Sequence, residues 1–505
     1  MENFLGGSAA LFSDPVALTI FFGGLLGGLL FGAIPGINML TLGAVILPFT
    51  VSMDPTNAIM LYSVIYTSGV FGGAITAILF NIPGSPENAP TALDGYPMTQ
   101  QGLAAKAIGA AVLCSSAGGL CSVLLMMAAT PAIAGWAISA FGPPEIFGLV
   151  CLGLAMSASV GARDLWHGLL SVTLGMLIAS IGTDPADGVP RFAFGFQFLL
   201  AGISFIPLVL GLFAVSEIFN QAEERINLGG ERPKVSMELP SLLEFWRMKV
   251  TVIRSVIIGF FAGILPGIGA VLAAFLSYNE AVRWGGKNSR FGKGELKGVV
   301  ASETANNAAT GAAMIPLLAL GLPGGALTAM MLAVFQLHGM EPGPLVFITS
   351  SDLVWTVFAA MFFANLLILA LGYFQTKVVV HVLRIPFPLL GPGILLVATV
   401  GAYALRHLSL DVWVMFIAGA AGFLLRRSGY SVAGVILGVI LGGIGESSFT
   451  KSMQMLDYNP LLLFTRPITA LLVGVALLTI GLRLVEAVRS SRRHRVALAN
   501  GSQSD

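Results

Sequence analysis

Charged residues are scarce in this chain and are gathered in a few short stretches. Of 505 residues, 56% are hydrophobic and only 10% are Asp, Glu, Lys or Arg, whereas soluble domains carry roughly 25% charged residues. Of the 26 basic and 25 acidic residues, 27 lie within 217–254, 280–303 and 483–505. Long uncharged apolar stretches are expected when lipid is the solvent. The sequence therefore predicts an all-α polytopic membrane protein and argues against a soluble enzyme or a nucleic-acid-binding protein.

Apolar segments recur along the whole chain, but their lengths differ. A spanning helix needs about 20 mostly apolar residues, and several segments here are shorter or are interrupted by Pro-Gly. We therefore expect about 10 to 14 transmembrane or re-entrant helices.

The basic residues predict the orientation in the membrane. Residues 1–216 contain three Lys or Arg residues, whereas 225–254 contains six, 283–297 five and 483–495 five. The positive-inside rule places the last three regions, and hence the C-terminus, in the cytoplasm. A segment between two cytoplasmic flanks cannot cross the membrane once, so 255–276 is expected to be re-entrant, with two short helices meeting at Pro266-Gly267.

Landmarks in the first half of the chain return in the second half. Residues 32–37 resemble 263–268 at an offset of 231, and residues 80–84 resemble 320–324 at an offset of 240. The first Pro-Gly has acidic flanks and the second has basic flanks, which favours two inverted repeats, the arrangement of many secondary transporters. The predicted parts are a first membrane repeat at 1–216, a cytoplasmic linker at 217–250, a second inverted repeat at 251–486 and a cytoplasmic tail at 487–505.

A first polar island, residues 81–97, interrupts the apolar sequence. Its four prolines prevent a continuous helix. Its Asn, Ser and Thr groups and freed backbone N–H groups could replace the hydration shell of a ligand, and a helix that restarts near Thr91 would direct its positive end at an anion. An ordinary extramembrane turn would fit the same residues.

A second polar island begins at Ser302. Glu303, Asn306 and Asn307 are spaced i, i+3 and i+4 and share one helix face. A carboxylate and two amide oxygens in an Ala-rich helix suit Na⁺ or a proton relay, and ionisable groups inside a membrane are candidates for function. Alternatively, Glu303 starts a helix at the interface and the two asparagines serve helix packing.

Candidate substrate-binding residues lie at the Pro-Gly interruptions and beside them. Gly72 and Gly73 belong to a run of small residues that could equally serve close helix packing. The candidates are Pro35, Gly36, Asn38, Gly72, Gly73, Asn81, Pro83, Gly84, Ser85, Thr91, Pro266, Gly267, Pro323, Gly324, Gly325 and Thr328.

Motifs of membrane enzymes and of ATPases are missing from the sequence. It contains no GxxxxGK[ST], no HExxH and no GxSxG, and its five histidines are scattered. We expect no catalytic residues and no cofactor. Two other classes stay open, a permease powered by an ATPase on another chain and a membrane-embedded enzyme acting on lipid-linked substrates.

The islands carry a family resemblance. Residues 301–307, Leu320 to Gly324 and His338 to Leu345 resemble the large membrane subunit, TctA type, of tripartite tricarboxylate transporters. The resemblance extends over about residues 15–485, and one departure is Gly325, where a small hydroxyl residue is expected.

The resemblance implies a secondary active importer of tricarboxylates or related organic acids in a bacterial-type inner membrane. Transport would be coupled to a Na⁺ or H⁺ gradient, with a possible Na⁺ near Asn306 and Asn307. The implied partners are a small four-span membrane subunit, a periplasmic solute-binding protein, an organic acid anion and membrane lipid, with no nucleic acid.

Overall fold

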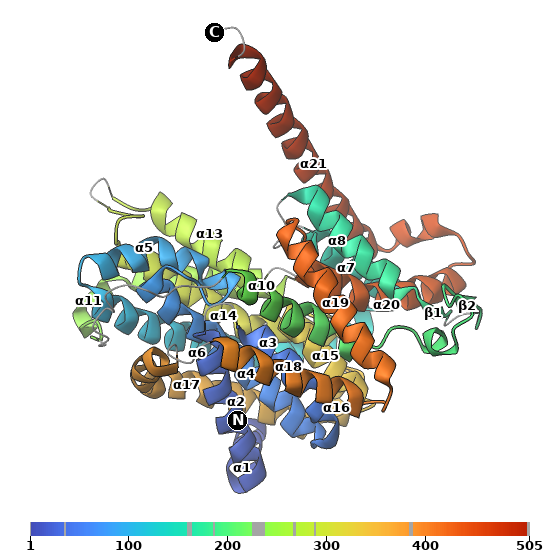
Figure 1. Ribbon diagram of the computed structural model, residues 1–505, viewed down its shortest axis with the longest axis horizontal. Helices are drawn as coiled ribbons and strands as arrows, with labels where there is room; N and C mark the ends of the chain where they lie inside the picture. The colour runs from blue at the N-terminus through green and yellow to red at the C-terminus, as the bar shows by residue number, and fades with distance from the viewer. Residues whose placement is uncertain are drawn as a thin grey trace. The chain divides into compact units, whose positions relative to one another are not determined.

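The computed structural model describes residues 2–34, 37–158, 164–184, 187–224, 238–265, 269–286, 289–382 and 387–501. In these residues the chain forms 21 α-helices and one two-stranded sheet, which confirms the all-α prediction (Figure 1). The chain divides into two compact units. Unit 1 comprises Met1–Ser139 and Ser204–Leu424, and unit 2 comprises Ala140–Ile203 and Leu425–Asp505.

Unit 1 contains the two polar islands. Its first part holds α1 (Glu2–Ser13), α2 (Pro15–Gly32), α3 (Met39–Ile46), the 3-10 helix η1 (Leu47–Ser52), α4 (Pro55–Phe80), the 3-10 helix η2 (Pro86–Asn88), α5 (Ala89–Gln100) and α6 (Ala104–Ala140). Its second part holds α9 (Phe205–Val209), the π-helix η4 (Leu210–Val215), α10 (Ser216–Glu224), α11 (Leu242–Arg247), α12 (Lys249–Ile264), α13 (Gly269–Arg283), α14 (Leu296–Leu320), α15 (Ala326–Leu337), α16 (Val346–Thr349), α17 (Ser351–Val382), α18 (Phe387–Ala404) and α19 (Ser409–Arg427).

Two ion pairs connect distant parts of the chain within unit 2. The buried carboxylate of Glu145 accepts two hydrogen bonds from Nη1 of Arg466, at 3.0 and 2.9 Å. Arg191 donates both Nη groups to Glu446. Its elements are α7 (Pro143–Ser157), α8 (Leu165–Ala179), β1 (Gly182–Thr183), antiparallel to β2 (Pro190–Arg191), η3 (Gln197–Ala201), α20 (Val432–Met455), η5 (Pro460–Thr465) and α21 (Pro467–Gly501).

Seven helices among the described residues are long and apolar enough to cross a membrane, judged by length and composition. Further apolar helices, including α3 with η1, α7, α8 and α15, are shorter. The chain is thus a multi-pass membrane protein. The number of crossings, and the predicted boundaries at 216, 250 and 486, stay predictions.

Helix α2 packs on α4 through glycines, and α12 packs on α14 in a similar way. In each pair, two glycines of the first helix face the backbone of the second, so that a Cβ there would meet that backbone. Glycines allow such close helix approach. The glycines are related by the offset of 231 and their partners by 240. The contact of Gly28 with Ile65 corresponds to that of Gly259 with Ala305. The contact of Gly32 with Gly69 corresponds to that of Gly263 with Ala309.

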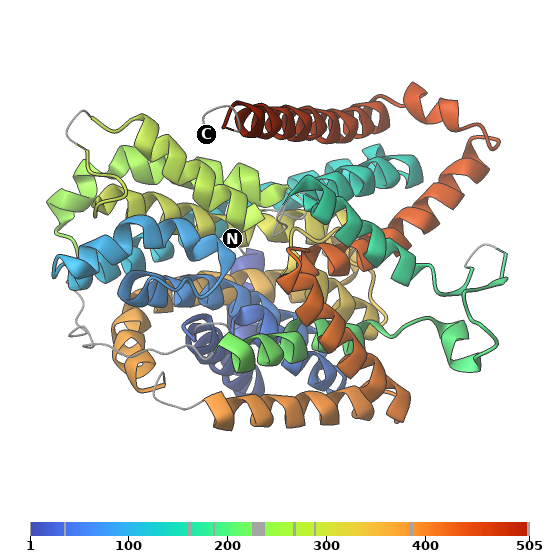
Figure 2. The ribbon, with the colours of Figure 1, turned by 45° about the horizontal axis from the view of Figure 1, so that its top comes forward.

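Helices α12 and α13 form an antiparallel hairpin (Figure 2). Ser277 Oγ donates to Ser255 Oγ at 2.7 Å, and the Arg254 guanidinium lies 4.4 Å from the centre of the Trp284 ring. These contacts bring the start of α12 and the end of α13 together, as a re-entrant hairpin requires. Its tip, at Pro266 and Gly267, lies outside the described residues, and its placement in the membrane stays a prediction.

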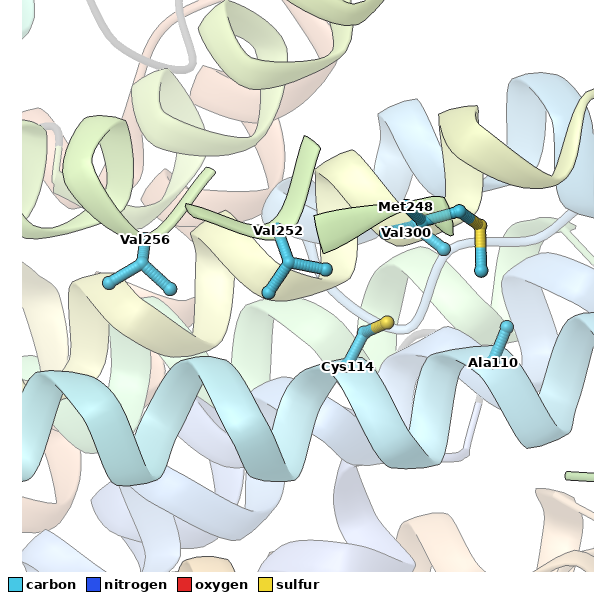
Figure 3. Packing of buried hydrophobic residues seen from close by; sticks show 6 residues of the cluster. All are labelled: Ala110, Cys114, Met248, Val252, Val256 and Val300. Atoms are coloured by element: carbon cyan, nitrogen blue, oxygen red, sulfur yellow. The ribbon is translucent and has the colours of Figure 1, made fainter. Parts of the chain in front are cut away.

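The α12–α13 hairpin packs against a helix from the first half of the chain. Figure 3 shows Cys114 and Ala110 of α6 beneath the side chains of α12. Because burial of apolar surface stabilises such contacts roughly in proportion to area, this cluster fixes the second-half hairpin beside α6. The remaining members are Met248, Val252, Val256 and Val300.

Candidate functional site

Both long helices that lead into the polar islands end in the same way. Helix α4 ends at Asn81, with φ 57°, and α14 ends at Gly321, with φ 72°, both in the left-handed conformation that often terminates helices. The next N–H then bonds back to the helix, Ile82 to Thr76 at 3.4 Å in the first case. In the second case the equivalent bond joins residues 322 and 316 at 3.0 Å.

Each Pro-Gly turn then folds back onto the helix that precedes it. Gly84 N donates to Gly73 O at 3.3 Å, and a Cβ on Gly84 would lie 2.6 Å from Gly73 Cα. In the second half, a Cβ on Gly324 would lie 3.0 Å from the carbonyl oxygen of Ala313. Glycine is therefore needed at Gly84 because another side chain would collide with the backbone of α4.

The two polar islands meet at the carboxylate of Glu303, which is fully buried in α14. Its Oε1 accepts from the Thr91 hydroxyl and from Asn88 Nδ2, the latter at 3.3 Å. Asn306 Nδ2 donates to the same oxygen at 3.3 Å, and Ser115 of α6 donates to Oε2 at 3.1 Å. A carboxylate group has room for about four hydrogen bonds, so these donors fill its capacity as an acceptor. Glu303 thereby ties α5, α6 and η2 to α14.

Asn88 is the second centre of this network. Its Oδ1 accepts from the Ser85 hydroxyl at 2.6 Å, and its Nδ2 also donates to the carbonyl of Val70 at 3.0 Å. A Cβ on Gly73 would collide with Asn88 Oδ1. Gly73 therefore makes room for the asparagine that reaches Glu303.

Two acceptor oxygens close to this network are buried and lack a donor among the described residues. Asn307 uses its Nδ2 to reach Glu303 O at 3.1 Å and Asn306 Oδ1 at 2.8 Å, while its own Oδ1 has no partner. Glu87 Oε1 also has none, although the Glu87 carbonyl accepts from Asn306 Nδ2 at 3.3 Å. Buried polar atoms without partners are rare, and a bound water or ion is one explanation for them.

Asp94, on α5, ties the first island to the start of α14. Its Oδ1 accepts from the backbone N–H groups of Gly294 at 3.0 Å and Glu295 at 2.8 Å, and its Oδ2 accepts from the Tyr278 hydroxyl at 2.9 Å. Gly294 and Glu295 come directly before α14, so Asp94 holds the segment that enters this helix from a distant part of the chain.

The predicted site residues fall into three groups. The structure brings together Ser85, Thr91 and the residues at 303, 306 and 307, with Gly73 and Gly84 shaping the first turn beside Pro83. Others serve the backbone: Asn38 Oδ1 accepts from the N–H groups of residues 40 and 41, and Thr328 bonds Gly325 within the same turn. Gly72 packs against α2, and Pro323, Gly324 and Asn81 form the turns described above. Pro35, Gly36, Pro266 and Gly267 lie outside the described residues.

Sequence reasoning missed Asn88, Ser115 and Asp94. Asn88 and Asp94 lie in the first island, so their polar type within an apolar chain was a usable signal. Ser115 stands alone in the apolar helix α6, 188 residues from Glu303, and nothing in its sequence neighbourhood indicates that contact.

Long apolar helices, a repeated Pro-Gly turn and a buried polar network between the two halves define a polytopic membrane protein with the features of a transporter. Residues 18–437 match the family described as "Tripartite tricarboxylate transporter TctA family", and the chain belongs to this family. It is therefore a membrane component of a tripartite tricarboxylate transporter, a family of transporters rather than of enzymes.

Two proteins of Agrobacterium vitis are similar to this chain. One, named "Uncharacterized 52.8 kDa protein in TAR-I ttuC' 3'region", is 36% identical over 488 residues, which cover 97% of each chain. The other, named "Uncharacterized protein in TAR-II ttuC' 3'region", is 35% identical over 234 residues, 46% of this chain and 97% of the relative. No solved structure matches the chain with significance.

Proposed function

We propose that this chain is the large permease subunit of a secondary active importer of tricarboxylates or related organic acids. The observation that carries the proposal is the meeting of the two polar islands at Glu303, beside the unpartnered oxygen of Asn307. Paired interruptions in corresponding positions of two repeats mark the binding sites of many secondary transporters.

In this proposal the anion is bound between the two Pro-Gly turns. The first turn precedes α5 and the second precedes α15, and helix starts favour negative charge. Hydroxyl and amide groups of the first island, with the backbone at Pro323 and Gly324, complete the recognition of carboxylates.

The coupling ion is Na⁺ or H⁺ and is held at Glu303, Asn306 and Asn307, of which Glu303 is the group that can take up a proton. The buried Oδ1 of Asn307 is an oxygen ligand without a competing donor. Asn306 connects the two other groups, because its Nδ2 donates to Glu303 Oε1 and its Oδ1 accepts from Asn307 Nδ2.

The remaining parts of the proposal concern the assembly. The chain works in a bacterial-type inner membrane with a cytoplasmic C-terminus, beside a small four-span subunit and a periplasmic solute-binding protein that delivers the substrate. Elevator-like movement of the hairpins against the rest of the protein would carry the substrate across.

Uptake into vesicles tests this function. The three components are reconstituted, and labelled citrate and other organic acids are supplied with an imposed Na⁺ gradient or an imposed pH gradient, without nucleotide. We expect one gradient to drive accumulation of at least one acid. Uptake that occurs only when ATP and an ATPase subunit are added would instead support a permease powered by a separate chain.

A further inference from the structure

A pocket lies at the open end of the α12–α13 hairpin, beside the start of α14. Its volume is about 150 Å³. Arg247, Arg254, Glu280, Trp284 and Lys297 supply its charged and aromatic lining. This pocket is distinct from the Glu303 network, because the two share no residue.

The wall of the pocket is held in place by its own contacts. Ser277 donates to Ser255 at 2.7 Å, and Ser255 donates to the Thr251 carbonyl at 2.7 Å. Trp284 Nε1 donates to Glu280 at 2.5 Å, and the Arg254 guanidinium lies over the Trp284 ring. Glu280 thus fixes the indole of Trp284 through a hydrogen bond, and the indole in turn orients the guanidinium of Arg254.

The charges of the pocket are unbalanced. Three cationic residues, Arg247, Arg254 and Lys297, line it with one carboxylate, Glu280, which already accepts from the indole. Within the described part of the chain, neither Arg247 nor Lys297 forms an ion pair with a carboxylate. An excess of positive charge in a concave site favours an anion.

An apolar stripe runs away from the pocket along α12. Val250, Ile253, Ile257 and Phe261 follow helical spacing and are each at least half exposed. Within a membrane, an exposed apolar face of this kind is suited to contact with lipid chains. A cationic pocket at one end of a lipid-facing stripe has the polarity of an anionic phospholipid, with its phosphate in the pocket and its acyl chain along the stripe.

We propose that this pocket binds the phosphate group of an anionic phospholipid at the mouth of the α12–α13 hairpin. The basic residues near it lie on the face that the positive-inside rule assigns to the cytoplasm. Bound there, the lipid joins α11, α12, α13 and the start of α14, and so holds the open end of the hairpin.

The test compares two double variants with the same change in charge. The pocket variant carries Arg254→Gln and Lys297→Gln. The control carries Arg290→Gln and Lys293→Gln, exposed residues of the neighbouring loop that do not line the pocket. Native mass spectrometry of the purified full chain in mixed micelles measures binding of dioleoyl phosphatidylglycerol and dioleoyl phosphatidylcholine, and a parallel arm supplies inorganic phosphate alone.

We expect the wild type and the control to bind phosphatidylglycerol in preference to phosphatidylcholine. The pocket variant should bind it about thirtyfold more weakly, since each basic residue near an anionic lipid contributes on the order of fivefold. Inorganic phosphate alone should bind far more weakly, because it lacks the acyl chain.

Three results would overturn the proposal. The pocket variant could bind phosphatidylglycerol as the wild type does, the control could lose as much binding, or inorganic phosphate could saturate the pocket while the lipid does not bind. If the pocket variant does not fold, Lys297→Gln alone, at an exposed position, should weaken binding on the order of fivefold. Unchanged binding in that single variant would refute the proposal equally.

Discussion

Replacing Glu303 tests whether its carboxylate holds the two halves of unit 1 together. Glu303→Ala removes the acceptor of the Thr91 and Ser115 hydroxyls, whereas Asn88 Nδ2 and Asn306 Nδ2 each keep a backbone carbonyl as a second acceptor. A buried donor without a partner costs about 1–3 kcal/mol. For the two hydroxyls together the loss is about 2–6 kcal/mol, a large part of the roughly 5–15 kcal/mol that stabilises a typical protein.

Glu303→Gln keeps one acceptor oxygen that can serve the three donors now bonded to Oε1, so it should cost only about 1–3 kcal/mol. The matched control is Ser302→Ala, because Ser302 is equally buried but bonds only to Gly298 O of its own helix, at 3.0 Å. We expect an effect below about 1 kcal/mol for this control.

The assay is the reaction of a maleimide dye with Cys114 during heating. Cys114 is fully buried beside Ser115, and replacing Cys121 and Cys151 by Ser leaves it as the single thiol. The midpoint of labelling should fall in the order Ser302→Ala, Glu303→Gln, Glu303→Ala. Equal midpoints for Glu303→Ala and the wild type would refute the reasoning.

Three further predictions follow from the packing. Gly263→Leu should destabilise the protein by about 1–3 kcal/mol or more in the same assay, because its Cβ would already lie 2.7 Å from Ala309 O. Asp94→Ala should cost about 2 kcal/mol or more, since it frees two N–H groups at the start of α14; an unchanged midpoint would contradict either account. Single cysteines at 250 and 283 should be labelled from the same side of the membrane, and labelling from opposite sides would exclude the re-entrant hairpin.

Two kinds of feature could be predicted from the sequence: motifs that occur in both halves of the chain, and polar residues that interrupt apolar stretches. The offsets of 231 and 240 reappear as glycine contacts such as Gly28 with Ile65 and Gly259 with Ala305. The two islands were recognisable because polar residues are rare in this chain.

The partners of each polar group could not be predicted. Glu303 was expected to offer its oxygens to a cation, whereas the structure has them accepting from four side chains, one of them Ser115. That contact joins residues 188 positions apart, and it depends on how α6 packs against α14. Asn38 was expected at the substrate but caps α3, a role that its position before a helix also suits.

Gradient-driven uptake by Asn307→Ala tests the central claim, that the meeting point of the two islands is the transport site. The matched control is Asn365→Ala, because Asn365 of α17 is also fully buried with an unpartnered Oδ1 but does not contact Glu303. With both variants folded, as judged by Cys114 labelling, we expect Asn307→Ala to lose uptake and Asn365→Ala to keep most of it. Uptake at the wild-type rate by Asn307→Ala would contradict the account.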